Sequence, residues 1–180
     1  MTIRPATAAD ADAIGEVYVA AWRSTYADIL PARLLATMSA PRLARRYRAD
    51  IAAGRHPILV AEQDSQVVGF CSGAVVRAPG LADAEVETLY VLDDHRDRGL
   101  GRALLQHAAA DLAQAGCGSL FLWVLRENPS RWFYERLGGR PVRQATTDLA
   151  GQTLDQVAYL WNPIARLITP HGQDRRANPD

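Results

Sequence analysis

The 180-residue chain contains no lysine, because all twenty of its basic residues are arginine. A Walker-type phosphate-binding loop ends in Gly-Lys-Ser/Thr, and Schiff-base enzymes, including those that use pyridoxal phosphate, need a lysine amine. The missing lysine therefore excludes both kinds of chemistry.

Cysteine and histidine are also scarce. Cys71 and Cys117 are the only cysteines, and the four histidines are scattered along the chain. Two cysteines without a secretory signal pattern are more typical of reduced packing residues than of a disulfide. No His or Cys pair has the spacing of zinc ligands, so we expect no metal site.

Neither excess charge nor a long apolar run is present. Twenty acidic residues balance the twenty arginines, and apolar residues make up 48% of the chain. The composition disfavours a nucleic-acid binder and a membrane protein, and predicts a cytoplasmic globular protein. We expect one domain over residues 1–165 and a polar, frayed tail over 166–180.

The hydrophobic pattern alternates between strand-like and helix-like segments, which predicts an α/β domain with a mixed sheet. Asp64 and Ser65 form a hairpin turn signal. The expected helices lie near residues 10–30, 31–38, 41–54, 100–115 and 128–139, and the expected strands at 2–4, 56–63, 66–76, 84–92, 119–125, 141–149 and 152–161.

A glycine-containing turn separates the strand at 84–92 from the helix at 100–115. It reads Arg96-x-x-Gly99-x-Gly101, with Arg98 and Arg102 beside the glycines. Three interpretations are open. The glycines may only relieve a tight turn. A dinucleotide fingerprint would need glycine where Leu104 stands. A pyrophosphate cradle would use the free N–H groups and the dipole at the helix start, with arginine charge beside them.

The elements on either side of this turn favour the third interpretation, the pyrophosphate cradle. Strand, R-x-x-G-x-G turn, helix, strand, Asn128, and a short helix with Phe133-Tyr134 before Gly138-Gly139 resemble the GNAT superfamily of acyl-CoA-dependent N-acyltransferases. The resemblance covers about Ala84 to Gly139. A weaker W-x-x-x-Y-x-x-I-L-P pattern from Trp22 to Pro31 and the closing hairpin extend it. It implies a largely antiparallel sheet of about six or seven strands, splayed in the middle and flanked by about four or five helices.

The resemblance also implies a coenzyme A site. Backbone groups of Leu89, Tyr90 and Val91 would pair with the pantetheine arm, and Asn128 and Tyr134 would follow the next strand. The N–H groups that would hold the pyrophosphate belong to Asp97, Arg98, Gly99, Leu100, Gly101 and Arg102, after Arg96. Two features depart from the family pattern: Asp97 is acidic, and Asn128 and Tyr134 are six residues apart instead of seven.

The implied reaction is attack of a primary amine on acetyl-CoA. A base must deprotonate the amine, and the family's strand glutamate corresponds first to Glu85 and second to Glu87. A bulged or splayed strand near Tyr90 and Val91 would leave an N–H group for the thioester carbonyl. Tyr134 would protonate the leaving thiolate. Alternatively, both glutamates face solvent and Tyr134 only packs with Trp132 and Phe133.

The amine acceptor is expected between the first helices, with Trp22 and Tyr26, and with Trp123 or Trp132, as its walls. It would be a small molecule or a peptide N-terminus. Two further functions stay open: a non-catalytic acyl-CoA sensor, and an N-acyltransferase for longer acyl chains, set by the width beside Val91 and Leu125. A homodimer is possible, as in many family members.

Overall fold

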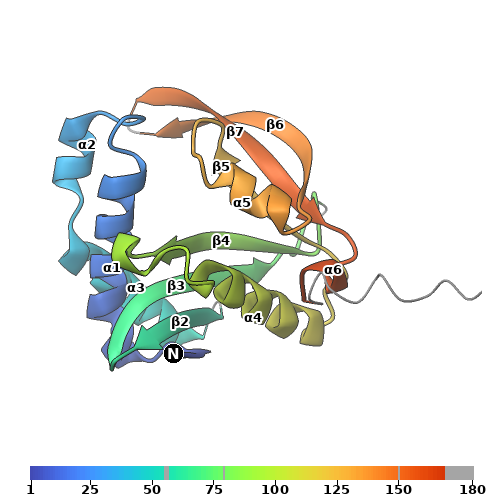
Figure 1. The fold of residues 1–180 in the computed structure, drawn as a ribbon, viewed down its shortest axis with the longest axis horizontal. Coiled ribbons are helices and arrows are strands. Elements are labelled where there is room, and N and C mark those ends of the chain that lie inside the picture. The colour runs from blue at the N-terminus through green and yellow to red at the C-terminus, as the bar shows by residue number, and fades with distance from the viewer. Residues whose placement is uncertain (55–56, 79, 150, 169–180) are drawn as a thin grey trace, which may run out of the picture.

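The computed structural model describes residues 1–54, 57–78, 80–149 and 151–168. Seven strands form one sheet in the order β1-β2-β3-β4-β5-β7-β6 (Figure 1). The elements are β1 (Thr2–Pro5), the 3-10 turn η1 (Ala8–Asp10), α1 (Ala11–Thr25), α2 (Ala32–Thr37), α3 (Ala40–Ala53), β2 (Ile58–Gln63), β3 (Gln66–Val75), β4 (Ala84–Val91), the 3-10 turn η2 (Asp93–His95), α4 (Leu100–Gln114), β5 (Leu120–Leu125), α5 (Arg131–Arg136), β6 (Arg140–Leu149), β7 (Gln152–Trp161) and α6 (Ala165–Ile168).

The expected strands and helices all occur, and α6 is an addition. We expected the polar tail to begin near residue 165. Leu167 is instead buried and Ile168 packs against the core, so these residues belong to the folded part. The rest of the expected tail, 169–180, lies outside the described residues.

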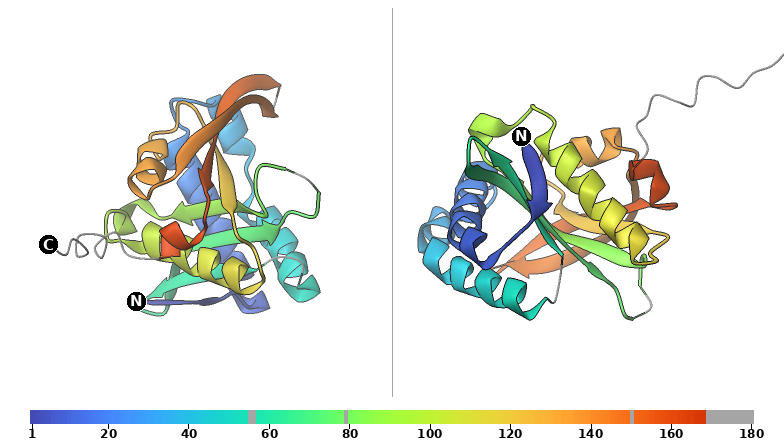
Figure 2. Two further views of the ribbon diagram at one scale, coloured as in Figure 1. Left: turned by 90° about the vertical axis from the view of Figure 1, so that its right-hand side faces the viewer. Right: turned by 90° about the horizontal axis from the view of Figure 1, so that it is seen from below.

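The helices cover the two faces of the sheet differently. Figure 2 shows α1 and α3 on one face and α4 on the other. Ile14 and Val17 of α1 pack with Tyr47 of α3 and Phe70 of β3. On the opposite face, α4 contributes a stripe of leucines to a second core that includes Leu120 and Leu122 of β5. Apolar residues at helical spacing thus orient each helix toward the sheet. No described helix is both long and apolar enough to cross a membrane.

The sheet opens in its middle, between β4 and β5. Among the described residues these two parallel strands pair only at Ala84 with Leu120 and at Glu85 with Phe121. All the other strand pairs are antiparallel. The splay that the sequence predicted is therefore present, and it begins immediately after Glu85.

The bulge of β4 lies earlier than expected. Ser72 of β3 is opposite Thr88 and Gly73 is opposite Val86, so the extra residue is Glu87 and not Tyr90 or Val91. Gly73 explains the position, because a Cβ there would lie 3.0 Å from the carbonyl oxygen of Glu85. The close approach that glycine allows places the irregularity at this point of the strand.

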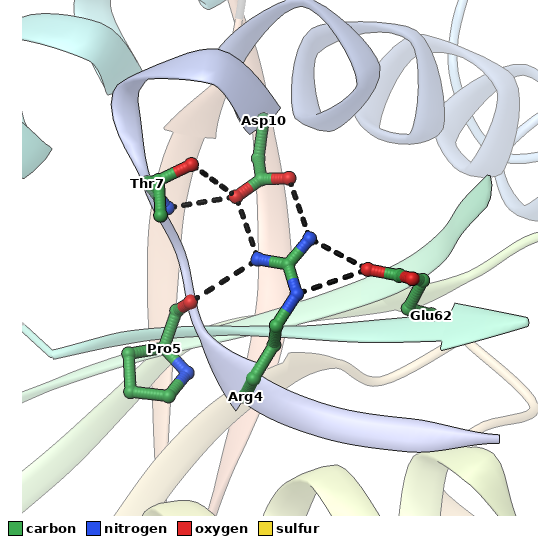
Figure 3. Close-up of polar contacts among 5 residues, drawn as sticks. All are labelled: Arg4, Pro5, Thr7, Asp10 and Glu62. Atoms are coloured by element: carbon green, nitrogen blue, oxygen red, sulfur yellow. Dashed lines mark hydrogen bonds and ion pairs between the residues drawn. The ribbon is translucent and has the colours of Figure 1, made fainter. Parts of the chain in front are cut away.

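The first strand is fixed by a network of ion pairs (Figure 3). The Arg4 guanidinium donates to both oxygens of Asp10, at 2.8 and 2.9 Å, and to Glu62 of β2 at 2.7 Å. Asp10 also accepts hydrogen bonds from the N–H and hydroxyl of Thr7. These bonds hold the pKa of Asp10 well below its usual range. The network joins β1 and β2 to the start of α1.

Candidate active site

A cavity of about 630 Å³ occupies the opening between β4 and β5. Residues from both faces of the sheet line it. It brings together fourteen of the sixteen predicted site residues: Trp22, Tyr26, Glu87, Leu89, Tyr90, Val91, Arg96, Asp97, Gly99, Leu100, Gly101, Arg102, Asn128 and Tyr134. The remaining two, Glu85 and Arg98, are not among the described residues of its lining.

The start of α4 presents unpaired donors to this cavity. No acceptor for the N–H groups of Gly99, Leu100, Gly101 and Arg102 exists in the described part of the chain, as expected for a first helical turn without a side-chain cap. Gly99 has a φ of 81°. The backbone of Gly101 faces the cavity without a Cβ. The turn therefore offers several adjacent N–H groups to an anion.

The acidic residue in this turn has a conformational explanation. Asp97 has a φ of 58°, in the left-handed region. Aspartate tolerates that conformation better than most residues other than glycine and asparagine. The departure from the family pattern at Asp97 is thus compatible with the turn, and its carboxylate is exposed.

The turn before α4 is fastened to the end of α1. Arg96 donates to the hydroxyl of Thr25 at 2.9 Å and forms an ion pair with Asp93 at 2.9 Å. Ser24 in turn donates a hydrogen bond to Asp93. The guanidinium also contacts the carbonyl oxygen of Val91 at 3.4 Å. Arg96 therefore links the glycine turn to α1, which carries Trp22 and is followed by Tyr26.

The edge of β4 that faces the splay carries free donors. The N–H of Leu92 donates to Val68 of β3 at 2.9 Å. Because hydrogen-bonded positions alternate along an antiparallel pair, the N–H groups of Leu89 and Val91 point away from β3, toward β5. β5 does not pair with β4 at that level. Two backbone donors therefore face the cavity.

Asn128 and Tyr134 reach the same cavity despite their shortened spacing. Asn128 is buried; its Oδ1 accepts from the N–H of Ser130 at 2.8 Å, and its Nδ2 donates to the Tyr26 hydroxyl at 3.1 Å. Tyr134 packs against Phe133, Tyr159 and Trp161. Its hydroxyl has no hydrogen-bond partner among the residues that the structure describes.

Burial strongly raises the pKa of the Tyr134 phenol, and nearby Tyr26 and Cys71 raise it further. The phenol is consequently protonated throughout the neutral range. A buried, protonated hydroxyl in a cavity with unpaired backbone donors is a candidate acid.

The two candidate carboxylates differ in position. Glu87, the bulged residue, lines the cavity, whereas the half-buried Glu85 does not. Burial, and then the charge of Glu87, raise the pKa of Glu85. We expected Glu85 as the first choice; the bulge changes the face that residue 87 presents, and it is Glu87 that reaches the cavity.

The cavity residues on the α1 side of the sheet differ in charge from those on the α4 side. Leu122 and Val124 of β5 pack on the α4 side, so the alternate residues Trp123 and Leu125 point to the α1 side. On β7, Val157 likewise packs on the α4 side and Gln156 faces the other way. We call the α1 side the aromatic half, comprising Trp22, Tyr26, Glu87, Trp123, Thr147 and Gln156, and the α4 side the basic half, comprising Gly99, Leu100, Gly101, Arg102, Phe133 and Arg136.

The aromatic half contains three of the four residues that we expected as walls of the acceptor site, Trp22, Tyr26 and Trp123. The Trp22 indole donates to the Tyr90 hydroxyl at 2.9 Å, and its ring lies 4.9 Å from that of Tyr26. Trp123 also lines the cavity, but Trp132 does not. The Trp132 ring is 51% exposed, with the Arg131 guanidinium 4.3 Å above it. Trp132 is therefore a surface residue.

Some cavity residues escaped the sequence analysis. Arg136 supplies the positive charge that we expected from Arg98, whose side chain is exposed outside the cavity. Thr147 and Gln156 come from the closing hairpin, which carries no motif. A Cβ at position 101 would lie 3.5 Å from Phe133, a contact that brings α5 and Arg136 beside the glycine turn. Among the described residues, no three His, Cys, Asp or Glu side chains gather as a metal site.

Comparison with known proteins agrees with this arrangement. The acetyltransferase (GNAT) family matches residues 17–139. YuaI of Bacillus subtilis (strain 168), named an uncharacterized N-acetyltransferase, is 31% identical over 171 residues, which cover 94% of this chain and 97% of YuaI. MnaT of Escherichia coli (strain K12), named an L-amino acid N-acyltransferase, is 31% identical over 119 residues, 64% of this chain and 65% of MnaT. The chain therefore belongs to the GNAT acetyltransferase family.

Solved structures share the fold. The structure of yncA from Salmonella typhimurium with its cofactor acetyl-CoA is 28% identical, has a TM-score of 0.68, and is matched over 100% of this chain and 98% of that chain. A GCN5-related N-acetyltransferase structure from Rhodopseudomonas palustris has a TM-score of 0.71 at 22% identity, over 89% of this chain and 94% of that chain. The predicted family and fold class are confirmed.

Proposed function

We propose that this protein transfers an acetyl group from acetyl-CoA to a primary amine, with both substrates in the cavity at once. One observation carries the proposal. Unpaired N–H groups at the start of α4, free N–H groups of β4 at the splay, and the protonated Tyr134 phenol meet in a single cavity. The kinship to yncA, solved with acetyl-CoA, supports the choice of donor.

Coenzyme A fits the residues present. Its pyrophosphate would accept hydrogen bonds from the N–H groups of Gly99 to Arg102, where the helix dipole also favours negative charge. Arg102 and Arg136 would add formal charge. The peptide-like pantetheine arm would pair with the N–H group of Val91, the nearer to the glycine turn of the two that β5 leaves free, and Asn128 would lie beside that path. When bound, acetyl-CoA supplies the acetyl group as a reactive thioester.

Glu87 is the base in this proposal. Only about one alkyl amine in a few thousand is neutral at pH 7, so the acceptor must lose a proton before it can attack. Glu87 lines the cavity and Glu85 does not. Glu87 would receive that proton, directly or through a water molecule, and the N–H group of Leu89, which the pantetheine arm leaves free, would stabilise negative charge on the carbonyl oxygen.

Tyr134 holds the proton that the leaving sulfur needs. Its raised pKa keeps the hydroxyl protonated, although it also makes the phenol a weaker acid. The burial that raises the pKa of the phenol would also raise the proton affinity of a thiolate formed beside it. The two proton affinities therefore rise together, so burial makes the transfer less unfavourable than the phenol's pKa alone would indicate.

The binding half of the proposal is tested by calorimetric titration of the wild-type protein and Gly101→Glu with acetyl-CoA. The variant places bulk and negative charge where the pyrophosphate would lie. Gly101→Ala is the control for bulk, because its Cβ would make only an ordinary contact with Phe133, and His107→Glu controls for charge farther along α4. Micromolar binding that only Gly101→Glu loses is expected; equal binding by all four proteins would contradict the site.

Two chemical classes of primary amine are candidates for the acceptor. MnaT is named an L-amino acid N-acyltransferase, so free amino acids are one class. Amines without a carboxylate are the other. The walls of the aromatic half distinguish them.

A further inference from the structure

We propose that the acceptor is a small primary amine with an apolar or aromatic body and no carboxylate next to its nitrogen. The inference rests on the proposed acetyl transfer and specifies its second substrate. It follows from the distribution of charge across the cavity and from the apolar packing at one end of the aromatic half.

The aromatic half contains one charged side chain. Among the described residues that define this half, Glu87 is the one carboxylate, and the others are aromatic rings, a threonine and a glutamine. Arg102 and Arg136 lie on the opposite face of the sheet, with the glycine turn. An amine placed for attack would thus meet a carboxylate and π faces, which attract a cation.

Among the described residues that line the cavity, Arg96 is the one arginine outside the basic half, and it is already engaged. Arg96 contacts Thr25 at 2.9 Å, Asp93 at 2.9 Å and the carbonyl oxygen of Val91 at 3.4 Å. Asp93 neutralises its charge and is itself held by Ser24. The carboxylate of an amino acid would have to share the Arg96 guanidinium with Asp93, which already offsets its charge.

Glu87 also acts against an amino acid directly. The carboxylate of an α-amino acid is two bonds from the nitrogen, so a nitrogen within reach of Glu87 brings two negative charges within a few ångströms. Like charges at that distance repel each other, and the repulsion disfavours an amino acid relative to an amine without a carboxylate. The aromatic walls provide no compensating donor of positive charge.

One end of the aromatic half is bordered by packing between distant parts of the chain. Leu30 and Leu35, from the segment after α1, form a cluster with Leu149 and Leu154 of the β6–β7 hairpin, and Trp22 and Tyr26 belong to the same cluster. Leu149, Trp22 and Tyr26 also line the cavity, so this packing gives it an apolar wall. Such a wall suits the apolar or aromatic body of a small amine.

The test compares initial rates of thiol release from saturating acetyl-CoA with matched acceptors. Phenethylamine is paired with phenylalanine, and tryptamine with tryptophan, and kcat/KM is expressed per neutral amine to remove differences in amine pKa. We expect each amine to exceed its amino acid at least about tenfold. Phenylalaninamide, which keeps the bulk without the negative charge, should behave like the amine.

The Glu87→Gln variant identifies the origin of the preference. Its rates fall with all acceptors, but the ratio of phenethylamine to phenylalanine should shrink toward one, because the repelling charge is gone. A ratio unchanged in the variant would contradict the role of Glu87, and phenylalanine acetylated as fast as phenethylamine would overturn the inference. Faster reaction of a Phe-Ala-Ala peptide would assign the site to chain ends instead. If acetyl-CoA binds and no amine reacts, the proposed function fails and the inference fails with it.

Discussion

Gly139 lies against the indole ring of Trp161: a Cβ at position 139 would be 2.7 Å from Cζ2 of Trp161 and 2.9 Å from the carbonyl oxygen of Tyr134. The ring cannot retreat easily, because Trp161 is fully buried and donates a hydrogen bond to the carbonyl of Leu137 at 2.9 Å. The absence of a side chain at Gly139 therefore fixes how α5 and Tyr134 sit on the sheet.

Gly139→Ala should destabilise the protein by about 1–3 kcal/mol, as expected for an added methyl group in a filled core. The melting temperature followed by circular dichroism should fall by roughly 3–10 °C. Gly80→Ala is the matched control, because its Cβ would make only contacts of 3.6 Å or more. Equal melting temperatures for both variants would show that the Trp161 contact relaxes without strain.

Tyr134→Phe should lower kcat about 100-fold and leave acetyl-CoA affinity nearly unchanged, because it removes a proton donor and keeps the ring. Tyr159→Phe is the control: its ring packs in the same cluster, and its hydroxyl donates to Glu135 at 2.7 Å outside the cavity. A Tyr134→Phe enzyme of normal kcat would assign Tyr134 to packing alone. A wild-type protein that binds acetyl-CoA and acetylates no amine would be the sensor of the alternative hypothesis.

Glu87→Gln should lower kcat/KM at pH 7 about 100-fold, while Glu85→Gln should lower it little, because only Glu87 lines the cavity. The loss in Glu87→Gln should be smaller at high pH, where more of the amine is already neutral. Rate profiles between pH 6 and 10 measure both effects. Greater damage from Glu85→Gln would return the role of base to Glu85.

Glu85→Gln should stabilise the protein near neutral pH. The pKa of Glu85 is raised in the folded state by burial and by Glu87, so the folded protein binds this proton more tightly than the unfolded chain does. The ionised carboxylate therefore destabilises the fold above the raised pKa, and the penalty disappears as the pH falls to the ordinary value. Melting temperatures of variant and wild type should differ at pH 7 and converge near pH 4.

Asp10→Asn should destabilise the protein by about 1–2 kcal/mol at pH 7. This is less than the loss expected for a fully buried ion pair, because the Arg4 side chain is partly exposed. The pKa of Asp10 is depressed, first of all by its hydrogen bonds to Arg4. Its contribution is therefore complete above the ordinary value of 3.8 and decreases as the pH falls below it. Asp12→Asn, which removes the exposed Arg48 pair, is the control and should change the melting temperature little. An Asp10→Asn deficit as large at pH 2 as at pH 7 would contradict the ionic origin.

The sequence predicted the elements and brought the residues of the glycine turn, Asn128 and Tyr134 to one cavity, because both depend on local patterns. Asp64 and Ser65 have φ values of 51° and 62°, as a tight hairpin needs, and Gly99 adopts the left-handed conformation expected of the turn. Local patterns also placed Asn128 and Tyr134 after β5.

The errors concern relations between distant segments. The choice between Glu85 and Glu87 depends on the bulge opposite Gly73, which only the pairing of β3 with β4 reveals. Arg136 reaches the cavity because Phe133 packs at Gly101, and Gln156 because the closing hairpin joins β5. Such contacts leave no periodicity in the sequence.

Arg96 ties the glycine turn to Thr25, and through Asp93 to Ser24, so the two substrates would bind to one connected piece of protein. An anion that orders the turn would therefore also restrain the end of α1, next to Trp22 and Tyr26. Thermodynamic linkage makes this coupling reciprocal: the factor by which bound acetyl-CoA increases the affinity for the amine equals the factor by which bound amine increases the affinity for acetyl-CoA. A variant that removes the Arg96 contacts should reduce this cooperativity of binding more than it reduces the affinity for either substrate alone.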